Sequence, residues 1–263
     1  MSLIYKGYVD TPYGQIHYRR LRQVDGPILV LLHQTASSGQ MFERLMGLLA
    51  GEFHTIAPDT PGFGNSFSPP EGFTIEFLAS SLHAALTTLG VASCYVFGHH
   101  TGAAIAVQMA YAHPEFVQKV ALSGPPLLSA DQKDRLRASL KPIELVEDGS
   151  HLIAVWQRIR QRDPSLPLEI VHREVLLTQM ARQAAQRAYQ AVFEQSFGDQ
   201  LSALQQPALI ISGEYDTLRD SAEPAYALLK NGHICIVPGA GPYLCDQHAS
   251  EVAQILRTFF QMS

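Results

Sequence analysis

The sequence has few of the features that mark secreted, disulfide-bonded or membrane-spanning proteins. Its 263 residues include three cysteines, Cys94, Cys235 and Cys245, an odd number without CxxC spacing, so neither a disulfide framework nor a cysteine metal site is indicated. No apolar run approaches the ~20 residues that span a bilayer. The chain also begins without a basic and apolar leader, which is typical of proteins that are not secreted. These absences predict a reduced, cytoplasmic protein with no membrane association.

An excess of positive charge and the common phosphate-binding motifs are also missing. The net charge is −5 and the isoelectric point lies near 6.1, so the chain has no general electrostatic attraction for nucleic acid or anionic membranes. Neither Gly-x-Gly-x-x-Gly nor Walker-type spacing occurs, and no cofactor is therefore indicated. The expected partner is a small-molecule substrate, and the sequence does not indicate an oligomeric state.

The pattern that is present alternates strand-like and helix-like segments. This alternation is typical of an α/β fold whose mostly parallel sheet carries helices on both faces. Helices are expected to include residues 75–89, 101–112 and 250–260. The strands are expected at residues 4–9, 15–21, 28–32, 54–58, 94–98, 117–123, 208–212 and 233–237.

One long stretch interrupts this alternation. More than 70 residues between 127 and 200 have helical patterns and no strand pattern, which is too long for an ordinary loop. We therefore expect a core of residues 1–127 and 200–263 and a helical cap of residues 128–199. Six large side chains of the cap are candidates either to line a substrate pocket or to hold the cap helices together: Trp156, Leu176, Leu177, Met180, Tyr189 and Phe193.

The segment Gly98-His99-His100-Thr101-Gly102 joins a predicted strand to a predicted Ala-rich helix. In the Gly-x-Ser-x-Gly turn, the central residue adopts a strained conformation that projects its reactive atom above the sheet, and the glycines avoid clashes. Here the central side chain is the imidazole of His100, and histidine accepts a positive φ better than most residues. His99 is expected to point the other way, as a buried and hydrogen-bonded residue.

Further motifs accompany this turn in a recognisable order. They are His33-Gln34-Thr35-Ala36-Ser37-Ser38, the Asp-x-x-Gly-x-Gly-x-Ser segment of residues 59–66, Gly213-Glu214-Tyr215-Asp216 and Gly239-Ala240-Gly241. With the strand order and the helical insertion, they resemble the α/β-hydrolase superfamily over nearly the whole chain. The similarity is greatest to its capped esterases, C–C bond hydrolases, dehalogenases and haloperoxidases. This resemblance implies an α/β-hydrolase fold, and it implies that Asp216 stands at the catalytic acid.

The chain departs from the family pattern at three positions. His100 stands where the family has its nucleophilic serine, and Pro242 stands where it has its catalytic histidine. Gln34 replaces a glycine in the turn whose backbone N–H helps to bind an oxyanion. The resemblance implies that Gln34, Thr101, His33 and Pro242 surround the oxyanion and the pocket. His248, six residues after Pro242, is the alternative candidate for a displaced base.

The space left by the missing histidine suggests a role for His100. Its side chain is expected to reach Asp216, which would accept a hydrogen bond from one ring nitrogen and leave the other as a general base. The predicted function is hydrolysis of a small apolar ester, thioester or ketone by a non-serine mechanism. The alternatives are a cofactor-free lyase, decarboxylase or isomerase that uses the same base, and a non-catalytic ligand-binding relative. A metal site of His33, His100 and Asp216 lacks any ligand spacing in the sequence, so no metal is predicted.

Overall fold

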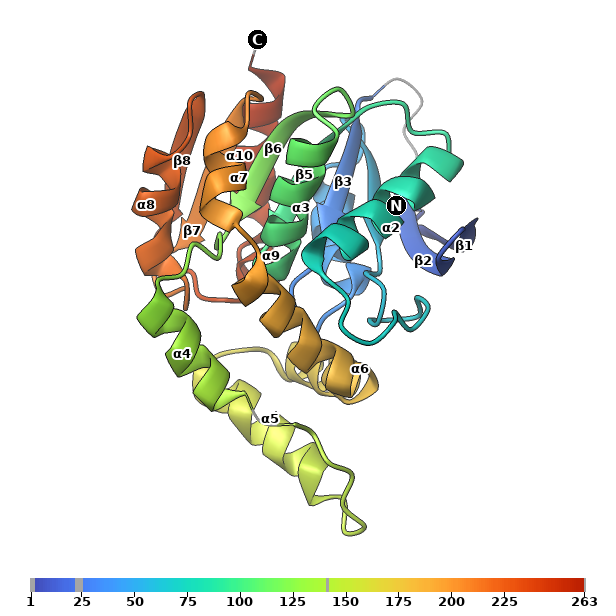
Figure 1. Ribbon diagram of the computed structural model, residues 1–263, viewed down its shortest axis with the longest axis vertical. Coiled ribbons are helices and arrows are strands. Elements are labelled where there is room, and N and C mark those ends of the chain that lie inside the picture. The colour runs from blue at the N-terminus through green and yellow to red at the C-terminus, as the bar shows by residue number, and fades with distance from the viewer. Residues whose placement is uncertain (1–2, 22–25, 141, 263) are drawn as a thin grey trace.

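The computed structural model describes residues 3–21, 26–140 and 142–262, and it places one sheet at the centre of the molecule (Figure 1). Eight strands of the described chain form this sheet in the order β1-β2-β4-β3-β5-β6-β7-β8. The hairpin of β1 and β2 is antiparallel, β2 pairs antiparallel with β4, and the remaining neighbours are parallel. The strands are β1 (Tyr5–Thr11), β2 (Gly14–Leu21), β3 (Ile28–Leu32), β4 (His54–Pro58), β5 (Cys94–His99), β6 (Val117–Ser123), β7 (Ala208–Gly213) and β8 (Gly232–Val237). The predicted α/β fold class is confirmed.

Helices cover both faces of the sheet, and this explains why the central strands are apolar along their whole length. One face packs against α2 (Ile75–Thr88), α3 (Thr101–Ala112), α7 (Phe197–Ala203) and α8 (Ala222–Ala227). The other face packs against α1 (Glu43–Leu48), α9 (Leu244–Gln247) and α10 (Ala249–Gln261). Two short 3-10 helices, η1 (Gly39–Phe42) and η2 (Arg219–Ser221), complete the connections.

The helix α3 is enclosed by protein, since residues 101–110 are all buried. Small alanine side chains let this helix lie close to the sheet and to α2. The strands predicted from the sequence agree with the observed ones to within two residues at each end. The predicted strands are therefore confirmed. Continuous apolar runs bounded by turn residues are typical of strands covered on both faces, which is why the sequence indicated them.

The chain between β6 and β7 has helices and, within its described residues, no strand. These helices are α4 (Ala130–Ser139), α5 (Ser150–Arg162), α6 (Leu168–Glu194) and α7. The first three, called here the insertion helices, lie together beyond one end of the sheet (Figure 1). The helix α6 is kinked at Arg182, whose φ of 36° and ψ of −107° are not helical. In the described residues, no helix combines the length and the apolar character needed to cross a membrane.

Candidate active site

The turn between β5 and α3 has the sharp geometry that its glycines predict. His100 has φ 50° and ψ −110°, a conformation that costs free energy for a non-glycine residue and is held only when the surroundings fix it. A Cβ atom on Gly98 would clash with the carbonyl group of Gly102, and one on Gly102 would clash with that of Leu32. Both glycines are therefore required for the close packing of α3 on the ends of β5 and β3.

The imidazole of His100 contacts the carboxylate of Asp216, which follows β7. His100 Nε2 lies 2.9 Å from Asp216 Oδ2 and 3.0 Å from Oδ1, so the contact expected from the sequence is present. Burial raises the pKa of Asp216, but the charge and hydrogen bond of His100 lower it further, and the net pKa is well below its usual range. Asp216 is therefore ionised, and His100 Nε2 carries the proton that it accepts.

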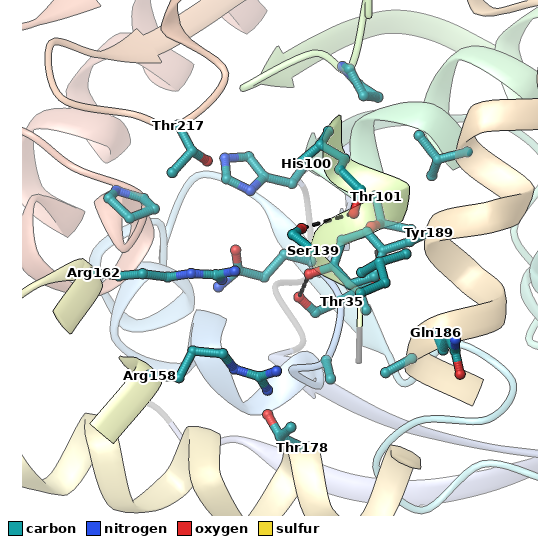
Figure 2. A pocket seen from close by; sticks show the side chains of 18 of the residues that line it. Thr35, His100, Thr101, Ser139, Arg158, Arg162, Thr178, Gln186, Tyr189 and Thr217 are labelled. Atoms are coloured by element: carbon teal, nitrogen blue, oxygen red, sulfur yellow. Dashed lines mark hydrogen bonds between the residues drawn. The ribbon is translucent and has the colours of Figure 1, made fainter. Parts of the chain in front are cut away.

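This arrangement determines which nitrogen of His100 is available. Because Nε2–H donates to Asp216, the lone pair of a neutral ring is on Nδ1. Among the described residues, none hydrogen bonds to Nδ1. Figure 2 shows the ring at the edge of a cavity, with Thr217 beside it and Arg162 across the open space. A base at Nδ1 is thus accessible to a small molecule in this cavity.

His99 lies beneath His100 and is fully buried, as expected. Its Nε2 is 3.0 Å from the carbonyl oxygen of Pro242, and its Nδ1 is 2.9 Å from Ser123 Oγ. A carbonyl only accepts, so Nε2 carries the proton and Nδ1 accepts from the serine hydroxyl. Burial, followed by the charge of His100, lowers the pKa of His99 to about 3. His99 is therefore a neutral residue that fixes Pro242 while its ring stacks on His100 at 4.2 Å between centroids.

Gly124, at the end of β6, is a site residue that the sequence reasoning missed. It has a φ of +57°, and a Cβ atom there would come within 2.6 Å of His100 Nε2 and still closer to Cδ2. The His100 ring therefore occupies space that only a glycine leaves free. The available signal was the position of Gly124 directly after a buried strand, at the same sheet edge as His100.

A cavity of about 360 Å³ opens above these residues, and His100, Gln34, Thr101 and Pro242 line it as expected. Its walls come from the loops after β3, β5, β6 and β7 on one side and from the insertion helices on the other. This is the carboxyl end of the parallel strands, where open α/β sheets bind their ligands.

The expectation that His33 belongs to the pocket is wrong. His33 is buried away from the cavity lining. Its Nδ1 donates to the carbonyl of Gln34 at 2.8 Å, and its Nε2 accepts from the N–H of Thr60 at 2.9 Å. Burial lowers the pKa of His33, so the ring is neutral. With both nitrogens used by the backbone, His33 joins two turns, and it does not group with His100 and Asp216 as a metal ligand.

The apolar side chains expected beneath the cap are only partly in the cavity. Tyr189 and Phe193 line it, whereas Leu176 and Met180 are 49% and 58% exposed. The other two, Trp156 and Leu177, are also absent from the lining; Trp156 packs in the contact between α5 and α6. Helical periodicity identifies an apolar face but not the direction in which that face points. The lining is also more polar than expected, because it includes arginine, glutamate and glutamine side chains from the insertion helices.

His248, the alternative base expected from the sequence, lies outside the site. It lies at the start of α10, where its Nδ1 is 3.4 Å from Glu251 Oε1, and it is not part of the cavity. The alternative of a displaced base at His248 is therefore wrong.

Residues 27–249 match the sequence pattern of the family described as alpha/beta hydrolase fold. The chain belongs to this family. It is 26% identical over 244 residues to the 2-(acetamidomethylene)succinate hydrolase of Mesorhizobium japonicum, which covers 88% of this chain and 87% of that protein.

Solved structures of other α/β hydrolases share the fold over almost their full lengths. The structure of E-2-(acetamidomethylene)succinate hydrolase aligns with a TM-score of 0.82 and 22% identity, covering 99% of this chain and 100% of that one. The enol-lactonase from Burkholderia xenovorans LB400 aligns with a TM-score of 0.76 and 19% identity, covering 97% and 100%. These likenesses establish the architecture in which the residues above are placed.

In this α/β hydrolase, a buried ionic network attaches the insertion helices to the sheet. Glu174 of α6 accepts a hydrogen bond from Ser37 Oγ at 2.9 Å. Its neighbour Arg173 donates to both carboxylate oxygens of Asp246 at 2.9 and 2.8 Å. Burial raises the pKa of Glu174 despite the attraction of Arg173. These contacts fix α6 over the strand ends and so hold one wall of the cavity in place.

Proposed function

We propose that this protein is a hydrolase of small esters or thioesters in which His100 acts as a general base oriented by Asp216. In this proposal His100 occupies the place of the family's serine, Pro242 that of its histidine, and residues 128–199 form a cap over the core. The observation that carries it is the 2.9 Å contact between His100 Nε2 and Asp216 Oδ2, made by a ring that lines the cavity. No other described residue is needed as a nucleophile.

The positions of the protons on His100 and Asp216 suit the activation of a water molecule. The lone pair of His100 Nδ1 takes a proton from a water molecule as the water oxygen bonds to the carbonyl carbon of the substrate. The imidazolium that forms keeps its Nε2–H on Asp216, whose negative charge stabilises it. The proton on Nδ1 then passes to the leaving oxygen or sulfur as its bond to carbon breaks. One water is consumed per bond cleaved, and the histidine ends as it began.

The negative charge on the carbonyl oxygen needs donors close to His100. The N–H of Thr101 begins α3, and such first-turn groups have no acceptor within the helix. Thr101 Oγ1 lies 2.9 Å from Thr35 Oγ1, which ties the start of α3 to the turn that carries Gln34. We assign the oxyanion to the Thr101 N–H, with the Gln34 amide as a second donor in the cavity lining. One such donor contributes about 10²–10³-fold in kcat in other enzymes.

The relatives support hydrolysis as the reaction class. The 2-(acetamidomethylene)succinate hydrolase and the enol-lactonase are named for reactions of small molecules with water. Their names support a small-molecule hydrolase, and the contact between His100 and Asp216 supports the non-serine mechanism proposed here.

The test is to screen small esters and thioesters for acid release and to repeat the active cases with His100→Ala and His100→Gln. We expect both variants to lose about 10²–10⁴-fold in kcat, the contribution of a positioned general base. His248→Ala is the matched control, since that histidine makes only a long contact with Glu251. Hydrolysis in ¹⁸O-labelled water should place one label in the acid product. Turnover that survives in His100→Ala, or a product without label, would contradict the proposal.

A further inference from the structure

The wall of the cavity formed by the insertion helices is rich in arginine. Arg158 and Arg162 lie four residues apart on α5, and Arg182 lies at the kink of α6; all three line the cavity. Figure 2 shows the side chains of Arg158 and Arg162 extending from α5 into the open space that His100 also faces. All three arginines remain solvent-accessible, as a group that binds a ligand must be.

These arginines differ from neighbouring arginines in having no hydrogen-bond or ion-pair partner among the described residues. On the same helices, Arg160 donates to the carbonyl of Leu166, and Arg187 pairs with Glu194. Within the described chain, by contrast, Arg158, Arg162 and Arg182 make no hydrogen bond or ion pair. The carboxylate of Glu174 also lines the cavity, but Arg173 and Ser37 hold it. No hydrogen bond or ion pair from the described residues therefore balances the positive charge of these three arginines.

The like charges on α5 are close enough to repel each other. Burial, followed by the charge of Arg162, lowers the pKa of Arg158. Arg162 in turn opposes the rise that burial gives to the pKa of Tyr243, the residue after Pro242. The positive charge of Arg162 therefore influences the end of the cavity that contains Tyr243. At this end His99 also donates a hydrogen bond to the Pro242 carbonyl. Like charges at this helical spacing are destabilising, and an anion between them would remove the cost.

We propose that Arg158 and Arg162 form a carboxylate-binding subsite, so that the substrate is a small ester or thioester that also carries a free carboxylate. This inference rests on the proposed function in one respect: the bound carboxylate and the carbonyl that reacts at His100 are taken to belong to the same substrate molecule. The planar guanidinium groups match a carboxylate through paired hydrogen bonds. Apolar groups such as Ile143 and Ile159 lie on the same wall and would contact the carbon chain. This proposal replaces the apolar substrate expected from the sequence with an anionic one.

The single tryptophan lies outside the cavity lining, on the same helix as the two arginines, so its fluorescence can report ligand binding to that helix. Trp156 is the single tryptophan, and it lies on α5 two residues from Arg158. We would titrate the protein with succinate and follow the tryptophan fluorescence, using the neutral diamide succinamide for comparison. Succinate should give a saturable change in fluorescence, and added KCl should weaken its binding. Succinamide should give no change in fluorescence.

Substitution then assigns the binding to the two arginines. Arg158→Gln and Arg162→Gln should each weaken succinate about tenfold or more, the range lost with one charged hydrogen-bonding partner. Arg135→Gln is the matched control: it removes the same charge from α4, is exposed and does not line the cavity. Equal succinate binding by the control and the two cavity variants, or no saturable binding by the wild type, would overturn the subsite. So would displacement of succinate by inorganic phosphate at equal concentration.

A second readout separates this inference from the proposed function. His100→Ala should bind succinate like the wild type, because Arg158 and Arg162 are both intact in this variant. In the wild type, monomethyl succinate should be hydrolysed with a lower KM than dimethyl succinate. The arginine variants should lose this preference, and Arg135→Gln should keep it. If the wild type binds succinate but hydrolyses neither ester, the proposed hydrolase function is rejected and the carboxylate subsite is retained. If the arginine variants still prefer the monoester over the diester, the carboxylate subsite is rejected and the hydrolase function is retained.

Discussion

The ring of His100 lies directly against the Cα atom of Gly124, in the space that a side chain on that residue would fill. A Cβ atom at Gly124 would approach His100 Nε2 to 2.6 Å and Asp216 Oδ1 to 3.4 Å. The contact between His100 and Asp216 thus depends on a glycine from a third strand end. This relationship explains how a histidine side chain fits in the sharp turn after β5.

Gly124→Ala should therefore greatly reduce turnover without unfolding the protein. The methyl group would push the imidazole away from Asp216, and the positive φ of +57° adds strain at the same residue. We expect kcat to fall about 10²-fold or more, as for loss of the general base. The control is Gly149→Ala, whose φ is +73° and whose Cβ would meet nothing within 4 Å. Equal activity in the two variants would show that the His100 position does not matter.

Asp216→Asn should impair turnover through the orientation of His100. An amide at residue 216 can present an N–H to Nε2, which favours the tautomer with its proton on Nδ1, so the base would face away from the cavity. We expect a loss in kcat of up to about 10⁴-fold, the effect of the comparable change in a serine-protease triad, with little change in KM. Steady-state kinetics measure both values, and an unchanged kcat would contradict the orienting role.

The stability of the protein should fall as the pH drops from neutrality, partly because of His99. Its pKa is about 3 in the folded protein, against an ordinary value of 6.5, so below pH 6.5 the unfolded chain binds a proton that the folded one does not. Between pH 6.5 and about 3, each pH unit of acidification then removes up to about 1.4 kcal/mol from the free energy of unfolding. Urea unfolding at several pH values measures this slope. His99→Gln, which keeps a donor for Pro242, should reduce the slope, whereas His248→Gln should not.

Asp59 should be a stability residue rather than a site residue. Its buried carboxylate accepts hydrogen bonds from His17 at 2.8 Å, from Arg19 at 3.2 Å and from the N–H of Gly39 at 2.8 Å. Asp59→Ala would leave the buried guanidinium of Arg19 without this partner. We expect a loss of about 3–5 kcal/mol in the free energy of unfolding, measured by urea denaturation.

The exposed Asp10→Ala is the control for this change. Asp10 accepts one hydrogen bond from Gln15 on the surface, and such substitutions change stability by about 0.5 kcal/mol or less. Burial raises the pKa of Asp59, yet the His17 hydrogen bond and other groups lower it more, so the net pKa lies below its usual value. Its contribution is therefore present above about pH 4 and should be lost as the pH falls further. Similar losses for both aspartates would contradict the assignment.

The site was only partly predictable from the sequence, and particular residues show why. His100 and Asp216 were found because each follows a strand in a motif of fixed order, and strand ends at one sheet edge meet in space. Gly124 follows the intervening strand β6 but belongs to no such motif, so nothing local linked it to His100. His33 was misassigned because its motif fixes the turn and not the direction of its ring, which contacts Thr60 instead of the cavity.

The sequence by itself determined the order of strands and helices, the sharp turn at His100 and the family of the fold. These follow from local properties: side-chain periodicity, the conformational freedom of glycine and the burial of continuous apolar runs. Tertiary structure alone decided that Nε2 of His100 contacts Asp216 and that Gly124 leaves room for the ring. It also decided that Arg158 and Arg162 face the cavity with no partner in the described part of the chain. Each of these depends on segments far apart in the chain, and the rotation of a helix about its axis is set by what packs against it.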